Sequence, residues 1–116
     1  MNEAQINEIW LVKFPFSDLT ASKLRPALII ANHRQEIILI GIFSKIPIDN
    51  IKPFWVLLSA TDSNFPQTGL KKSSLIRADK IATVSQIVLN RKLGTLPLSY
   101  IPFVQNALKN ALNLTN

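Results

Sequence analysis

The chain has 116 residues, of which 47% are hydrophobic; this suits one domain with one core and is too small for two cores of ordinary size. It has no cysteine, which excludes disulfides and thiolate chemistry and favours a reducing compartment. The net charge of +6, from 13 basic and 7 acidic residues, favours a polyanionic partner, nucleic acid first. Because the basic residues are scattered, a generic basic domain is the alternative. We expect residues 1–116 to form a single domain.

The N-terminus and the apolar runs predict a protein that is neither secreted nor embedded in a membrane. Residues 1–10 contain no basic segment followed by an apolar run, so no secretory signal is visible. The longest apolar run, Ile37–Phe43, is far shorter than the roughly 20 residues of a membrane-spanning helix. We expect a soluble, cytoplasmic protein.

Short apolar runs separated by turn residues predict a chain rich in β-strands. In chain order, the expected strands are Glu8–Phe14, Pro26–Ala31, Glu36–Phe43, Phe54–Ser59, Ser73–Asp79, Lys80–Ser85 and a short Arg91–Leu96. Residues 32–35 are few enough for a hairpin connection. Two longer segments, 15–25 and 60–69, are expected to be loops.

One helix is predicted, at the C-terminus. Ser99 is a plausible N-cap, and Pro102 would fall in the first turn, where proline is tolerated. An apolar stripe then recurs at helical spacing, formed by Ile101, Val104, Leu108, Ala111 and Leu112. Six or seven short strands with no helix-sized crossover between them predict a mainly β fold, a small and strongly bent barrel closed by this helix.

Several kinds of catalytic site are excluded or disfavoured by composition. The single histidine, His33, cannot supply a two-histidine acid–base pair, and its loop position favours an exposed side chain. A Ser-His-Asp triad would have to use His33, and no nucleophile-elbow pattern supports one. The absence of cysteine and the dispersed carboxylates predict no metal site, and Gly41, Gly69 and Gly94 form no phosphate-binding or dinucleotide-binding pattern. We therefore expect no metal and no cofactor.

The positive candidates are polar side chains at strand ends. Arg25 precedes Pro26, which suits the first position of a strand because it has no N–H to donate. Ser44 closes the third strand on the same face as three isoleucines, and period-two alternation makes Arg77 and Asp79 neighbours on one face. Each has a structural alternative: Arg25 could anchor a loop, Ser44 could bond to the backbone, and Arg77 with Asp79 could form a salt bridge.

Residues 8–30 and 68–85 together resemble the PemK/MazF-like family of type II toxin–antitoxin endoribonucleases, the mRNA interferases. The shared features are a first strand ending in phenylalanine, an Arg-Pro pair leading the second strand, a later Gly-Leu, an Ile-x-x-Asp segment and a threonine-bearing strand. The resemblance runs in order from Glu8 to about Leu112. Three positions depart from the family pattern: Asn7 replaces a common glycine, Lys13 a frequent acidic residue, and Ser44 a common threonine.

The resemblance implies an SH3-like barrel, a homodimer and metal-independent cleavage of single-stranded RNA that leaves a 2′,3′-cyclic phosphate and a 5′-hydroxyl. It also implies a cognate antitoxin that occupies the RNA groove. Arg25 falls on the catalytic arginine of the family, Ser44 on its Thr/Ser position, and Arg77 and Asp79 on an acid–base pair that some members use. The residues expected to bind RNA are Lys13, Ser17, Lys23, Lys45, Lys71 and Lys72.

These residue types suit metal-free RNA cleavage. A guanidinium stays charged at any relevant pH and can grip two phosphate oxygens at once, which is the role expected for Arg25. Ser44 would donate to the same phosphate or to a neighbouring 2′-oxygen, and Asp79, oriented by Arg77, is the candidate general base. Two alternatives stay open: a non-catalytic toxin of this fold that binds a topoisomerase, and a decayed relative that binds RNA without cutting it.

Overall fold

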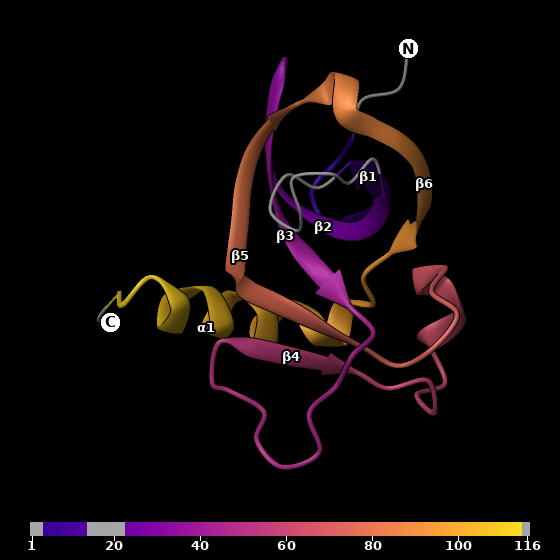
Figure 1. Cartoon of the computed structure of the whole chain (residues 1–116), viewed down its shortest axis with the longest axis vertical. Coiled ribbons are helices and arrows are strands. Elements are labelled where there is room, and N and C mark those ends of the chain that lie inside the picture. The colour runs from indigo at the N-terminus through magenta and orange to yellow at the C-terminus, as the bar shows by residue number, and fades with distance from the viewer. Residues whose placement is uncertain (1–3, 14–22, 115–116) are drawn as a thin grey trace.

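The computed structural model of the protein describes residues 4–13 and 23–114 (Figure 1). Their elements, in chain order, are β1 (Glu8–Lys13), β2 (Leu24–His33), β3 (Glu36–Phe43), β4 (Trp55–Leu58), the 3-10 helix η1 (Phe65–Thr68), β5 (Ser74–Ser85), η2 (Gln86–Val88), β6 (Leu89–Thr95), η3 (Leu98–Tyr100) and the α-helix α1 (Ile101–Ala111). The strands form one antiparallel sheet in the order β4-β5-β3-β2-β1-β6. The predicted class, mainly β with a C-terminal helix, is confirmed.

The sheet is strongly bent, with β5 and β6 arching around β1 and β2 (Figure 1). Both faces of the central strands are buried, which explains their nearly continuous apolar runs. Leu28 and Ile40 belong to a core layer that includes residues of α1, whereas Ile29 and Leu39 belong to a second layer on the other face. We call these the helix layer and the barrel layer. No helix of the described residues is long and apolar enough to span a membrane.

The prediction of two separate strands over residues 73–85 was wrong, because β5 runs through both. Ile40 pairs with Ile81 and the next residue of β3 pairs with Arg77, so residues 78–80 have no partner on β3. This irregularity contains three residues, an odd number, and therefore exchanges the two faces of the strand. Ala78 belongs to the helix layer before it, and Ala82 packs on the barrel layer after it. The strand continues through the position where the sequence pattern changes phase.

The C-terminal helix is confirmed, with two differences at its ends. Residues Leu98–Tyr100 form the short helix η3, so Tyr100 rather than Ser99 occupies the N-cap position, while Pro102 lies in the first turn as predicted. Val104 and Ala107 are buried against β4 and β5. Leu112 is 53% exposed because the helix ends before it, and it occupies the C-cap position at the start of the C-terminal turn.

The segment 60–69, expected to be a loop, contains η1, which is attached closely to β6. Thr68 is fully buried, and its hydroxyl donates to the carbonyl of Phe65 over 2.8 Å. A Cβ on Gly94 would lie 2.2 Å from the carbonyl oxygen of Gln67, and one on Gly69, which has φ of 75°, would lie 2.0 Å from that of Leu93. This close approach places the residues after Gly69 beside β6.

Candidate functional site

Arg25 lies within β2, which begins one residue earlier, and not in a loop before the strand. It pairs with Val12 of β1, and its side chain is half-buried. Two residues further along, Ala27 pairs with Gly41 of β3, which pairs in turn with Arg77 of β5. Residues paired across antiparallel strands point to the same face, and alternate residues share a face. Arg25 and Arg77 therefore share a face on strands two spacings, or roughly 10 Å, apart.

Arg77 and Asp79 lie on one face as predicted and form a bidentate ion pair, the structural alternative that the sequence had left open. Arg77 Nη2 donates to Asp79 Oδ2 over 2.8 Å, and Arg77 Nε donates to Oδ1 over 3.3 Å. Trp55 of β4, which pairs directly with Arg77, donates its indole N–H to Asp79 Oδ1 over 3.0 Å. The guanidinium lies 4.7 Å from the Trp55 ring centroid and 5.6 Å from that of Phe43. Three neighbours thus hold Arg77 in one orientation.

This network keeps Asp79 ionised. Partial burial by itself would raise the pKa of Asp79, but the hydrogen bonds and charge of Arg77, together with the Trp55 N–H, outweigh burial and lower the pKa below its ordinary value. Asp79 is therefore a carboxylate at neutral pH, as a general base must be. The lowered pKa also makes it a weaker proton acceptor than a free carboxylate.

A cavity of about 400 Å³ adjoins this network; we call it the Trp55 pocket. Its walls come from the end of β3 and the chain beyond it, from β4 and from β5, and its lining residues are Phe43, Lys45, Ile46, Pro47, Trp55, Leu75 and Arg77. It combines two aromatic rings with two cationic side chains, a composition that suits a flat, electron-rich ligand carrying negative charge nearby.

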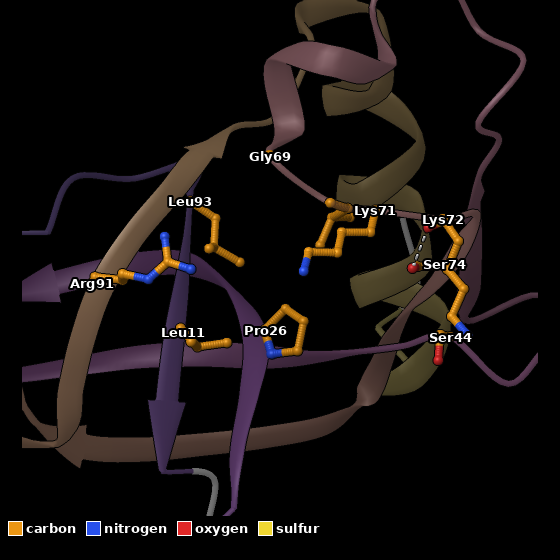
Figure 2. Close-up of a pocket in the computed structure, with 10 residues that line it drawn as sticks. Leu11, Pro26, Ser44, Gly69, Lys71, Lys72, Ser74, Arg91 and Leu93 are labelled. Carbon is orange, nitrogen blue, oxygen red and sulfur yellow. Dashed lines mark hydrogen bonds between the residues drawn. The ribbon is translucent and has the colours of Figure 1, made fainter.

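A second cavity, of about 360 Å³, contains Ser44; we call it the Ser44 pocket (Figure 2). Its polar lining consists of Ser44, Ser74, Lys71, Lys72 and Arg91. Figure 2 shows the side chains of Lys71 and Arg91 pointing toward one another across it, with Pro26 below them in this view. The hydroxyl of Ser74 donates to the carbonyl of Lys72 over 2.9 Å. This arrangement of cations and hydroxyls suits an anion such as a phosphate.

Comparison with known proteins identifies the family. A family model described as PemK-like, MazF-like toxin of type II toxin–antitoxin system matches residues 6–112. The chain belongs to this toxin family. A search of curated proteins finds no match.

Solved structures share the fold of this toxin. They include a mycobacterial endoribonuclease in complex with its cognate antitoxin (20% identity, TM-score 0.73, covering 97% of this chain and 98% of that one). A second is the Mycobacterium tuberculosis toxin MazF-mt6 (22% identity, TM-score 0.72, covering 94% of this chain and 99% of that one). A third comes from MazE-MazF of Deinococcus radiodurans (16% identity, TM-score 0.72, covering 99% of this chain and 100% of that one).

In this MazF-like fold the four predicted catalytic residues are divided between the two faces of the sheet. Arg25 shares a sheet face with the Arg77–Asp79 pair. Ser44, the first residue after β3, opens onto the other face with Pro26, while its two chain neighbours, Phe43 and Lys45, line the Trp55 pocket. The two pockets thus lie on either side of the chain that leaves β3. A bound strand of RNA would have to cross the chain that leaves β3 to contact both Ser44 and the Arg77–Asp79 pair.

The residues expected to bind RNA are spread along the toxin. Lys71 and Lys72 line the Ser44 pocket, and Lys45 lines the Trp55 pocket. Lys13 and Lys23 are exposed at the adjoining ends of β1 and β2, and Ser17 lies outside the described residues. No group of three potential metal ligands occurs within residues 4–13 and 23–114.

Arg91 was missed by sequence reasoning. It enters the Ser44 pocket because β6 pairs with β1, which places Arg91 opposite Leu11, itself opposite Pro26. The adjacent basic pair Arg91-Lys92 was the only local signal. Lys92 instead forms an ion pair with Glu8, 3.1 Å between Nζ and Oε2. Partial burial would raise the pKa of Glu8, but bonds from Gln5 and Trp10 and the charge of Lys92 lower it overall.

Proposed function

We propose that this toxin is a metal-independent endoribonuclease that cleaves single-stranded mRNA in the cytoplasm and thereby inhibits translation. One observation carries the proposal: within a MazF-like fold, a half-buried arginine on β2 shares a sheet face with a bidentate Arg–Asp pair. The net charge of +6 and the cations of the two pockets favour a polyanionic substrate.

In the proposed reaction, the 2′-oxygen of one nucleotide attacks the adjacent phosphorus while the P–O5′ bond breaks. The 2′-hydroxyl loses its proton, for which Asp79 is the expected acceptor, and the departing 5′-oxygen takes a proton from solvent water. Arg25 stabilises the negative charge that grows on the two non-bridging phosphate oxygens. Ser44 would bind a phosphate or a neighbouring 2′-oxygen from the other side of the chain leaving β3. The products are a 2′,3′-cyclic phosphate and a 5′-hydroxyl.

The purified protein is expected to cleave a long unstructured RNA in buffer containing EDTA, at a rate equal to that in Mg²⁺. New 5′ ends should accept phosphate from polynucleotide kinase without prior phosphatase treatment, since they carry hydroxyls. Failure to cleave RNAs of varied sequence, loss of cleavage in EDTA, or 5′-phosphate products would contradict the proposal.

We also propose a homodimer. The described residues include large apolar side chains that one small barrel leaves exposed, among them Ile48, Leu57, Phe103 and Leu114. Light scattering at micromolar concentration is expected to give the mass of two chains. A mass of about 13 kDa, that of one chain, would contradict the dimer.

The second proposed partner is an antitoxin that occupies the RNA groove. Fold relatives solved with their antitoxins support this expectation. An antitoxin that covers Arg25 and the cationic pockets would directly block binding of the RNA backbone. We expect the antitoxin segment that binds there to carry negatively charged side chains.

A further inference from the structure

We propose that the Trp55 pocket is a base-recognition slot that selects guanine at one position of the bound RNA. The inference rests on the proposed function, because it assigns the Arg77–Asp79 network a part in choosing the RNA sequence. It concerns specificity, and not the cleavage step.

The slot offers a rigid aromatic surface. Trp55 and Arg77 are directly opposite each other on β4 and β5, and the guanidinium lies over the indole ring at 4.7 Å from its centroid. The indole N–H is bonded to Asp79, so the ring cannot turn without losing that bond. Proteins that read single-stranded RNA stack unpaired bases on such aromatic and guanidinium planes.

The hydrogen bonds of Arg77 leave one of its edges available. Its Nε and one Nη2 hydrogen are directed at Asp79, along one side of the planar guanidinium. The other edge is formed by Nη1 and the second Nη2 hydrogen. Within residues 4–13 and 23–114, this edge donates no hydrogen bond. Two parallel N–H donors therefore remain, held in orientation by a carboxylate.

Guanine matches this edge because its O6 and N7 are adjacent acceptors, and arginine binds them in bidentate fashion. Adenine presents an N6 amino group beside N7, which would place a donor against a donor. A cavity of about 400 Å³ falls within the range of small-molecule sites, so it can admit a flat base. Lys45 in the wall and Arg25 on the same sheet face supply positive charge for the adjoining phosphates.

The test uses fluorescein-labelled nine-nucleotide oligoadenylates, 2′-O-methylated throughout so that they cannot be cleaved. The central base is guanine, hypoxanthine, 7-deazaguanine or adenine, and binding is measured by fluorescence anisotropy at one salt concentration. Guanine and hypoxanthine, which share O6 and N7, are expected to bind about ten-fold more tightly than adenine. 7-Deazaguanine, which lacks the N7 acceptor, should lose most of that advantage.

Variants separate base recognition from charge. R77K keeps the charge but loses the paired donors and the guanidinium plane, so whatever its affinity for the adenine probe, it should bind guanine no more tightly than adenine. W55L should weaken binding of all four probes through lost stacking. The control K109Q, on α1, should keep the full guanine preference. Thermal unfolding of each variant by circular dichroism verifies that it is folded, and the 7-deazaguanine comparison needs no variant.

Three results would overturn the proposal of a guanine slot. They are equal binding of the four probes by the wild type, binding of none of them, and a guanine preference that survives R77K. Conversion of a dimer to a monomer by W55L would also overturn it, because the pocket would then be an interface between two copies. If the slot fails while the wild type still cleaves RNA in EDTA, the proposed function stands without it. If no RNA is cleaved, the proposed function has failed.

Discussion

Replacing Arg25 by alanine is expected to lower the rate of RNA cleavage by about 100- to 1,000-fold, the usual effect of removing one preorganised donor to a developing oxyanion. Arg25 is held within β2 and half-buried, so little side-chain freedom is lost when it engages a phosphate. R25K should recover only part of the rate, since an ammonium cannot grip two oxygens in a plane. The rate is measured for the wild type, R25A and R25K by single-turnover cleavage of a labelled RNA.

A matched control replaces another arginine of the same hairpin. Arg34 is exposed at the turn after β2, with φ of 70°, a conformation that asparagine adopts readily. R34N removes the same charge and should cleave at close to the wild-type rate. Full activity of R25A would refute the nuclease assignment. Toxicity in cells that survives R25A combined with D79A would indicate a toxin that acts by binding, such as one that binds a topoisomerase.

Replacing Gly94 by alanine is expected to destabilise the protein by about 3 kcal/mol, the upper end of the usual cost of overpacking. The new Cβ would lie 2.2 Å from the carbonyl oxygen of Gln67 and 2.5 Å from the carbonyl carbon of Thr68. Both are backbone atoms, so no side-chain rotation can relieve the contact. Either β6 or η1 must move, and moving η1 also displaces Lys71 and Lys72.

Urea unfolding followed by tryptophan fluorescence measures this effect. G94A should have a lower midpoint with an unchanged slope, and its affinity for RNA should fall because the wall of the Ser44 pocket has shifted. N90A, at an exposed position of the same strand, should stay within about 0.5 kcal/mol of the wild type. An unchanged midpoint for G94A would show that η1 does not depend on its close approach to β6.

Local patterns predicted the strands and the helix well, because alternation and helical spacing are properties of neighbouring residues. The same-face placement of Arg77 and Asp79 follows from period two and is confirmed. The continuity of β5 could not be predicted, since an irregular strand and a strand break produce the same change of phase. The capping position of α1 was missed because η3 precedes it.

The candidate site was less predictable than the fold because it depends on pairing between distant segments. Arg91 joins the Ser44 pocket only through the pairing of β6 with β1. Trp55 was read as part of an apolar strand, and its bond to Asp79 depends on the pairing of β4 with β5. That Ser44 and Arg77 line different pockets also required the observed structure, since Ser44 lies just beyond the regular part of β3.

Residues 78–80, which have no partner on β3, determine how tolerant this strand can be of insertions and deletions. Substitutions of Lys80 leave the phase of β5 unchanged, whereas the loss of one backbone unit there would send Ala82 and Val84 out of the barrel layer and turn their neighbours inward. The barrel therefore depends on the parity of the length of this segment, while the side chains of Ala78 and Asp79 are kept by the core and by the ion pair with Arg77.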